Sequence, residues 1–329
     1  MRDESNLLRI LRAKRSGPED VSSASLAHTF LAVGNEYFDE GHFRYAHLCF
    51  DASLRLNPTQ AVSWSNCASA LLKLGRHHEA LEMAMSATRR QATFEMAHVH
   101  AGNAQLALGR TLSASKSFSR ILLLSSGSMA SAYAALAKVG LERIEAFQRA
   151  CLDAKRAIDA GNAAGALRHA EAALEIAPSA PRARAVQAEA LAQSNACAAA
   201  LALCEAALPL EWLPASCRRD ATAAASVARL HPDGAPHDAE LCTAFAMTCA
   251  RSLARLGRRR DATALLTHAV AATTPDAPQL RAALERLERV TRFAAAGDRD
   301  YKGDFDFIYR YYISCESSSP QLTHSPHHI

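Results

Sequence analysis

The chain has 329 residues, of which 49% are apolar and 21% are charged, and its formal net charge at pH 7 is +4. This length and composition allow a large buried core and argue against a disordered chain. Aromatic residues make up only 6% of the chain, and the scattered positive charge forms no basic stripe with interleaved aromatics, which nucleic-acid binding requires. We therefore expect no nucleic-acid partner.

The sequence also argues against a membrane or secreted protein. No apolar stretch approaches the roughly 20 residues that cross a bilayer. The first residues include Asp3 and Glu4 and lack the apolar segment of a signal peptide. The nine cysteines are odd in number and form no Cys-x-x-Cys pair, which favours free thiols in a reducing compartment. We predict a protein of the cytoplasm or nucleus with no membrane partner.

The first 26 residues contain a short amphipathic piece, followed by a polar stretch from Ser16 to Ser25. Segments of this kind at a chain end are commonly poorly ordered. We predict a flexible N-terminal segment over residues 1–26.

From residue 27 onward, small residues recur at an interval of 34 positions, beginning with Gly34, Ala68 and Gly102. Three further sets keep the same interval: Ala46, Ala80 and Ala114; Phe50, Ala84 and Phe118; Gly41, Gly75 and Gly109. This period is typical of tetratricopeptide repeats (TPR), each of which is a pair of antiparallel helices. We predict three TPR repeats in residues 27–128, over 27–60, 61–94 and 95–128.

The residues of each predicted hairpin have separate structural roles. Gly34 and Ala46 are small where the two helices approach each other, and Phe50 fills the space beside them. Gly41 allows the backbone to turn between the helices, and Pro58 ends the second helix.

The period breaks after the third repeat and then resumes. Residues 129–146 keep a helical pattern, and we expect them to lengthen the next first helix. Repeats 4 and 5 follow at about 147–180 and 181–214, so the block 129–208 holds the linking helix and these repeats. In repeat 5, Asn195 takes the turn position otherwise held by Gly, because Asn tolerates the left-handed conformation.

The last third of the chain is less regular. Residues 209–240 are rich in turn formers around a short helix near 219–230, and we predict an insertion or loop. The block 241–313 is predicted to hold repeat 6 (about 243–276), a long helix from Leu280 to Ala296, and a partial seventh repeat over Gly297–Tyr312. Residues 314–329 are mostly Ser, Pro and His, and we expect a disordered tail.

These elements together predict an all-α fold, a right-handed superhelical solenoid of TPR helix-turn-helix repeats. Each hairpin buries its apolar face only against its neighbours, and the stack presents a concave groove suited to another polypeptide. The first helix of each hairpin would line this groove. By phase, we predict these partner-binding residues: Leu31, Asn35, Phe38, Asn66, Ser69, Lys73, Met96, His100, Asn103, Lys155, Arg182 and Arg251.

The order of parts resembles that of the TPR-rich J-domain co-chaperones of the Hsp70/Hsp90 system. The stretches "NCASALLKLGRHHEAL", "ALEIAPSAPRARAVQAEAL" and "GDRDYKGDF" carry this resemblance. It implies a co-chaperone or adaptor that binds a protein or peptide, with Hsp70 and Hsp90 as candidate partners.

In chaperone-binding TPR proteins, a clamp of two asparagines and three cations grips the C-terminal carboxylate of Hsp70 or Hsp90. The resemblance places Asn35 and Asn66 at the two asparagine positions of this clamp. At the three positions where the clamp has cations, this chain has Leu31, Met96 and His100 instead. Each lost charge-assisted bond costs about 1.5–3 kcal/mol. We therefore expect an incomplete clamp in which the asparagines contact a peptide backbone.

The tripeptide His231-Pro232-Asp233 is the one by which J-domains stimulate Hsp70. Few cations precede it and no J-domain start does, so we interpret it as a loop and find no J-domain. Two alternatives remain open. The chain is the TPR portion of a larger, truncated J-domain or catalytic protein, or it is a structural subunit of a stable assembly that covers its C-terminal tyrosines.

No motif indicates catalysis. The sequence contains no nucleophile motif, phosphate loop or paired carboxylates, and the adjacent His77 and His78 point to different faces of a helix. We predict that the chain is not an enzyme and has no catalytic residues, no metal site and no cofactor.

Overall fold

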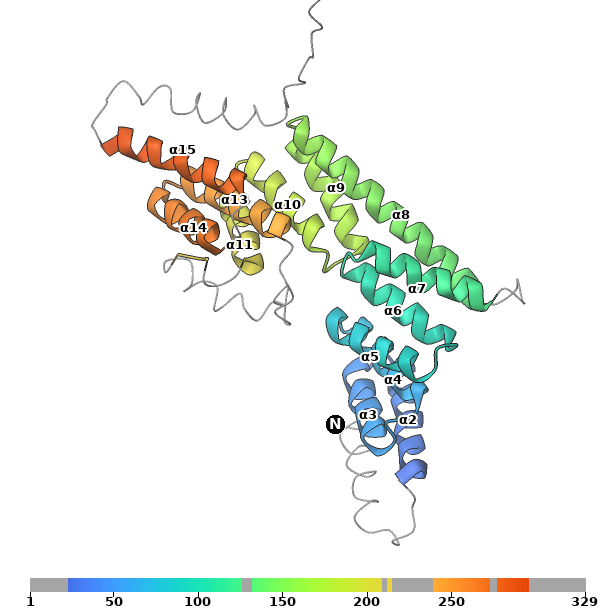
Figure 1. Cartoon of the computed structure of the whole chain (residues 1–329). Helices are drawn as coiled ribbons and strands as arrows, with labels where there is room; N and C mark the ends of the chain where they lie inside the picture. Colours follow the sequence, from blue (N-terminus) through green and yellow to red (C-terminus); the bar gives the residue numbers. More distant parts are fainter. Residues whose placement is uncertain (1–22, 126–131, 209–211, 215–238, 273–276, 296–329) are drawn as a thin grey trace, which may run out of the picture. The chain divides into compact units, whose positions relative to one another are not determined.

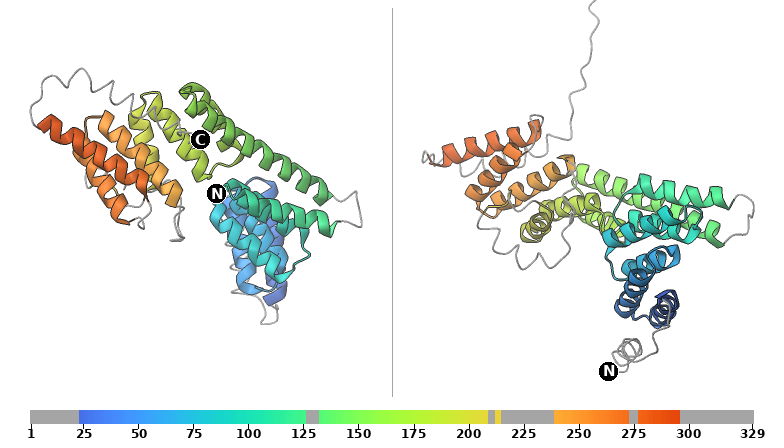
Figure 2. Two further views of the ribbon diagram at one scale, coloured as in Figure 1. Left: turned by 45° about the horizontal axis from the view of Figure 1, so that its top comes forward. Right: turned by 60° about the horizontal axis from the view of Figure 1, so that its bottom comes forward.

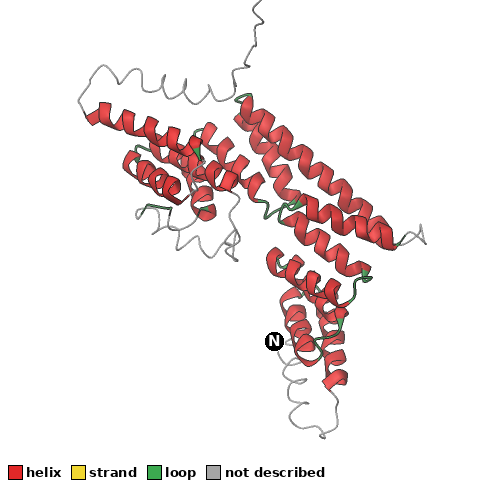
Figure 3. Ribbon diagram, viewed as in Figure 1, coloured by secondary structure: helices red, strands yellow, loops and turns green. Residues whose placement is uncertain are grey.

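The computed structural model describes residues 23–125, 132–208, 212–214, 239–272 and 277–295. These residues form thirteen α-helices and no strand (Figures 1 and 3). The predicted all-α class of helix-turn-helix repeats is confirmed. The chain divides into two compact units: unit 1 comprises residues 1–148 and 175–180, and unit 2 comprises residues 149–174 and 181–329.

Unit 1 consists of three antiparallel helix pairs and the beginning of a long helix (Figure 1). The pairs are α2 (Ser23–Asp39) with α3 (Phe43–Leu56), α4 (Ala61–Lys73) with α5 (His77–Arg90), and α6 (Glu95–Ala107) with α7 (Thr111–Leu124). The long helix α8 (Ala132–Asp159) begins in unit 1 and continues into unit 2. It is a single helix of 28 residues, where the sequence predicts a linking helix that lengthens the next first helix.

Helix α2 begins at Ser23, inside the segment predicted to be flexible. Thr29 Oγ1 donates a hydrogen bond to Ser25 O at 3.1 Å, and Ala27 is fully buried. The prediction for 1–26 is therefore wrong for its last four residues, and residues 1–22 lie outside the described part of the chain.

Two phenylalanine rings fill the space between the helices of unit 1. A Cβ atom built on Gly34 would lie 2.5 Å from Phe50, and one on Gly102 would lie 2.7 Å from Phe118. Phe118 is also approached from α8, where a Cβ on Gly140 would lie 2.5 Å from the ring. Both rings are almost completely buried. The predicted pairing of a small residue with a large one is confirmed here.

The helices of each hairpin are joined at a residue with positive φ. In repeat 5 this residue is Asn195, with φ of 64°, as predicted. The NH of Asn195 donates to Ala192 O at 3.3 Å and the NH of Ala196 donates to Leu191 O at 2.9 Å. These two bonds satisfy carbonyls that the end of a helix leaves open.

Unit 2 contains the rest of α8 and further helix pairs around a core of its own. The helices are α9 (Ala163–Ile176), α10 (Pro181–Gln193), α11 (Cys197–Ala207), α13 (Ala239–Arg255), α14 (Arg259–Ala272) and α15 (Pro278–Ala295). Figure 2 shows α13, α14 and α15 side by side in both views. Leu253, Leu265 and Leu280 are completely buried in this core.

The predicted insertion over 209–240 contributes to the core of unit 2. Trp212 and Leu213 are 6% and 0% exposed and pack with residues of α11 and α13. Residues 212–214 lie outside any helix, as predicted, but they are buried, because burying a large aromatic side chain is favourable. The predicted short helix near 219–230, the tripeptide His231-Pro232-Asp233, the restart at Gly297–Tyr312 and the tail 314–329 lie outside the described residues.

Candidate peptide-binding faces

The first helices of successive hairpins in unit 1 lie next to one another, α2 against α4 and α4 against α6. Asn35 on α2 is exposed and Asn66 on α4 is half-buried. The Nδ2 of Asn66 donates a hydrogen bond to Oδ1 of Asn35 at 2.9 Å. The structure thus brings together the two asparagines that the sequence places in the groove.

Other predicted groove residues extend from this pair along α4 and α6. Ser69 and Lys73 follow Asn66 on one side of α4, at spacings of three and seven residues. On α6, His100 and Asn103 follow Met96 at spacings of four and seven residues, and all three are half-buried. We call this surface the amide face: Asn35, Asn66, Ser69, Lys73, Met96, His100 and Asn103.

The amide face presents no cation at the three positions where a carboxylate clamp needs one. His100 Nδ1 lies 3.0 Å from the hydroxyl of the buried Ser65. Burial lowers the pKa of His100 to about 4, so its ring is neutral at pH 7. Leu31 is 9% exposed and packs in the core with Tyr37. Met96 carries no charge.

Two residues lie at the edges of this face. The sequence predicted a binding role for Phe38 and none for Arg143. Phe38 lies in the last turn of α2, and its ring meets that of Phe43 on α3 edge-on, with the ring centroids 5.2 Å apart. Arg143 on α8 was missed by sequence reasoning. Its guanidinium lies 3.4 Å from Asn103 Oδ1 and 3.4 Å from Ile176 O. The 34-residue phase breaks before α8, and the only available signal was the helical pattern of residues 129–146.

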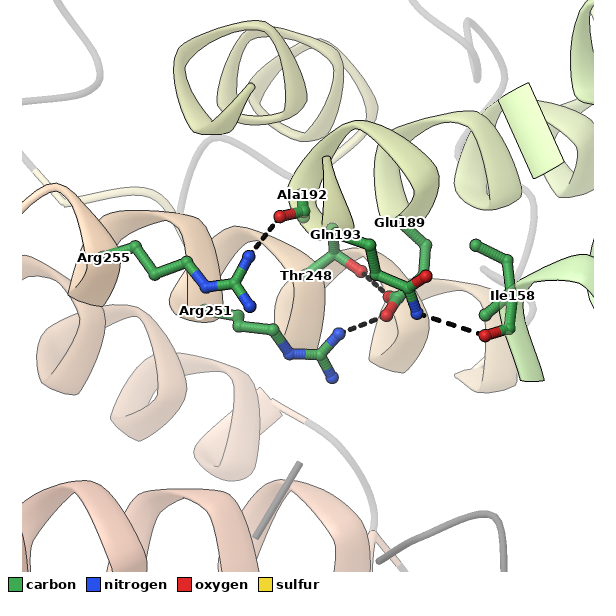
Figure 4. A network of polar contacts seen from close by, with 7 residues as sticks. All are labelled: Ile158, Glu189, Ala192, Gln193, Thr248, Arg251 and Arg255. Atoms are coloured by element: carbon green, nitrogen blue, oxygen red, sulfur yellow. Dashed lines mark hydrogen bonds and ion pairs between the residues drawn. The ribbon is translucent and has the colours of Figure 1, made fainter. Parts of the chain in front are cut away.

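In unit 2 the predicted groove residue Arg251 is part of an ion pair. Arg251 on α13 donates to Glu189 Oε1 on α10, and Thr248 Oγ1 donates to Glu189 Oε2 at 2.8 Å (Figure 4). The side chains of Arg251 and Glu189 are only 14% and 24% exposed. A carboxylate is thus held between α10 and α13 by a guanidinium and a hydroxyl.

The last turn of α10 is held from both sides (Figure 4). Arg255 on α13 donates to Ala192 O, and Gln193 Nε2 donates to Ile158 O on α8 at 3.4 Å. The sequence related these positions only by phase within each repeat. The pairing of Arg255 with Ala192 crosses the irregular region over 209–240, where no period applies.

The predicted Lys155 and Arg182 are both exposed and lie on α8 and α10. Burial raises the pKa of Cys151 to about 11, and the positive charge of Arg182 opposes that rise, which places Arg182 near α8. Lys155 follows Cys151 by one helical turn. We call this second surface the basic face: Lys155, Arg182, Glu189, Arg251 and Arg255.

Other classes of site have little support in the structure. The described residues hold no group of three or more His, Cys, Asp and Glu side chains that could bind a metal ion. Burial raises the pKa of Cys49 to about 11 and that of Cys67 to about 12, so both thiols stay protonated at neutral pH. None of the described helices is both long and apolar enough to cross a membrane.

Comparisons with known proteins give partial matches. No family model matches the chain. It is 31% identical over 104 residues to DnaJ homolog subfamily C member 7 of Homo sapiens, and this match covers 32% of this chain and 21% of that protein. It is 30% identical over 95 residues to Protein STIP1 homolog of Dictyostelium discoideum, and this match covers 29% of this chain and 17% of that protein. The matched stretches thus span about a fifth of the curated relatives' length.

The fold is matched over most of the chain by a solved structure. The crystal structure of the TPR domain of P58(IPK) aligns with a TM-score of 0.50 at 15% identity, over 90% of this chain and 74% of that one. This likeness shows the fold alone.

Proposed function

We propose that this tetratricopeptide repeat chain is a protein-interaction scaffold that holds an extended segment of a partner protein on its amide face. The observation that supports this most directly is the contact between Asn35 and Asn66 on adjacent first helices. An amide side chain offers two donors and an acceptor, which match the free NH and C=O groups of an extended peptide. The pair uses one N–H donor of Asn66 and the side-chain oxygen of Asn35. Among the described residues, the side-chain nitrogen of Asn35 has no hydrogen-bond partner.

The amide face is preorganised for binding. Asn35 and Asn66 stand on helices whose packing is fixed by buried residues such as Phe50 and Cys67. A ligand therefore immobilises little of the protein when it binds, which preserves more of the contact energy as affinity.

The partner we propose is Hsp70 or Hsp90. The resemblance to TPR-rich J-domain co-chaperones and the matches with a DnaJ homologue and a STIP1 homologue support this choice. Because His100 is neutral, Leu31 is buried and Met96 is uncharged, the three clamp positions offer no positive charge to a C-terminal carboxylate. We therefore expect the chain to bind an internal segment of the chaperone.

Calorimetry of the full chain with Hsp70 and Hsp90, each as full-length protein and as C-terminal peptide, tests the proposal. We expect a full-length chaperone to bind, and its C-terminal peptide to bind at least about tenfold more weakly. Asn35→Ala with Asn66→Ala should weaken the full-length complex about thirtyfold, since two lost hydrogen bonds at about 1 kcal/mol each come to about 2 kcal/mol. Gln91→Ala, which removes an exposed amide outside this face, is the matched control.

Each part of the proposal can fail separately. If none of the four ligands binds, Hsp70 and Hsp90 are excluded as partners. If a chaperone binds equally well to the asparagine variant, the amide face is not the binding surface. Micromolar binding of a C-terminal peptide would mean that a carboxylate is recognised without the three clamp cations.

A further inference from the structure

We propose that the basic face of unit 2 is a second binding surface, which takes an acidic peptide segment. This inference rests on the proposed scaffold function, since it assigns another part of a partner protein to a different place on the chain. Four cations and one carboxylate make up this face. An excess of positive charge on the first helices favours a ligand with several carboxylates.

The last turn of α10 lies between two of these cations. Arg255 donates to Ala192 O from α13, while Gln193 donates to Ile158 O on α8 (Figure 4). Lys155 lies three residues before Ile158, about one turn along α8. Both Lys155 and Arg255 are exposed, and neither forms an ion pair with a carboxylate among the described residues. Their charge is therefore available to a ligand.

Glu189 shows how this face accommodates a carboxylate. Its two oxygens accept hydrogen bonds from Arg251 and from Thr248. Arg255 follows Arg251 by four residues on α13, and its guanidinium spends one of five N–H donors on Ala192 O. The same chemistry that holds Glu189 is thus repeated one turn further along the helix, with donors to spare.

The spacing of the two arginines fits an extended peptide. Four residues of α-helix advance about 6 Å, and alternate side chains on one side of a strand are about 6.6 Å apart. Because Arg251 is already paired with Glu189 and is only 14% exposed, the carboxylates of the ligand would be bound by the exposed Arg255 and Lys155.

A peptide fits this face better than a nucleic acid does. Single-stranded nucleic acids bind where aromatic rings stack on the bases. The described residues of the basic face include no aromatic ring. Two half-buried residues lie one helical turn from cations of this face, Val186 after Arg182 and Cys151 before Lys155, and both suit an aliphatic side chain.

Fluorescence anisotropy with the full chain provides the test. The probe is an octapeptide of alternating Glu and Ser with both ends blocked, compared with its Gln-Ser counterpart and with an eight-nucleotide uridine RNA. We expect the Glu peptide to bind at least about tenfold more tightly than the other two, and to lose affinity as salt rises from about 0.05 to 0.5 M. Lys155→Gln with Arg255→Gln should weaken binding of the Glu peptide about tenfold relative to the unmodified chain. The control Arg260→Gln, at an exposed arginine on α14, should leave this binding unchanged.

The outcomes separate this inference from the proposed function. The variant with Asn35→Ala and Asn66→Ala should bind the Glu peptide as well as the unmodified chain does, because the amide face is not involved. Equal binding of the Gln peptide, tighter binding of RNA, or no effect of the double substitution overturns the basic face alone. If the unmodified chain binds the Glu peptide but neither Hsp70 nor Hsp90, only the choice of chaperone is overturned.

Discussion

The amide face of unit 1 and the basic face of unit 2 occupy equivalent places on the same fold but differ in chemistry. Both lie on the first helices of successive hairpins. On the former, Asn35 and Asn66 contact each other and His100 is neutral. On the latter, Arg251 and Glu189 form an ion pair and Arg255 stands beside them. The repeat fixes where these residues stand, whereas the residues themselves determine which ligand is bound.

The two units also offer two kinds of contact between helices, a buried aromatic ring in unit 1 and a largely buried ion pair in unit 2. The largest expected loss of stability concerns the ring. Phe118 in unit 1 is completely buried and touches both Gly102 and Gly140. Phe118→Ala should lower the free energy of unfolding by about 4 kcal/mol, because it leaves a ring-sized cavity. Chemical denaturation of the full chain, followed by circular dichroism, measures this loss.

A double-mutant cycle makes that result specific. The second repeat holds Ala68 and Ala84 at the positions of Gly102 and Phe118, and both alanines are fully buried. Gly102→Ala alone should cost about 2 kcal/mol because the new methyl group meets the ring. In the Phe118→Ala background it should be neutral or slightly stabilising, since Ala favours a helix over Gly. Additive effects would show that the ring and the glycine are not in contact.

Unit 2 has, in addition to its apolar core, a largely buried ion pair between α10 and α13. Glu189→Ala leaves the Arg251 guanidinium, only 14% exposed, without its carboxylate. We expect a loss of about 3 kcal/mol in the same denaturation experiment. Asp153→Ala, which removes the exposed partner of Arg156, should cost less than about 0.5 kcal/mol. Equal effects of the two substitutions would contradict a structural role for the Glu189 pair.

Adding cations to the amide face should reduce the difference between the two faces. Met96→Lys with His100→Arg restores two of the charges that a carboxylate clamp uses. We expect the affinity for an Hsp70 or Hsp90 C-terminal peptide to rise at least about tenfold, since charge-assisted bonds are the stronger ones. Calorimetry with the same peptide carrying a C-terminal amide is the control, and this amide should bind the variant no better than the unmodified chain.

The 34-residue period predicted the hairpins well because a turn and a close approach each demand a particular residue. A left-handed turn accepts Gly or Asn, which located Asn195, and a buried ring demands a glycine opposite, which located Gly34. The sequence also placed Asn35 and Asn66 on adjacent first helices, but they are 31 residues apart and so occupy different positions of the repeat.

Contacts that depend on tertiary packing left no such signal in the sequence. Trp212 stands among turn formers and is nevertheless buried in the core of unit 2. The partners Glu189 and Arg251 are separated by the irregular residues 209–240, so no period relates them. Arg143 follows the break in phase after the third repeat, and only the path of α8 brings it to Asn103.

The smallest expected effect concerns the neutral state of His100 on the amide face. Burial lowers its pKa to about 4 from the ordinary value of 6.5, so the unfolded chain binds more protons than the folded chain between these pH values. The stability of the unmodified protein should therefore fall as the pH drops from 6.5 towards 4, by about 1 kcal/mol at pH ~5.5. His100→Gln keeps a partner for Ser65 and does not titrate, so this part of the loss should disappear. Denaturation at about pH 7 and about pH 5.5 measures the difference, with His28→Gln, an exposed histidine on α2, as the control. Identical pH dependence in the unmodified chain and in His100→Gln would mean that His100 accepts a proton as readily as a histidine in water. The amide face would then gain a cation in mildly acidic conditions and would come to resemble the basic face.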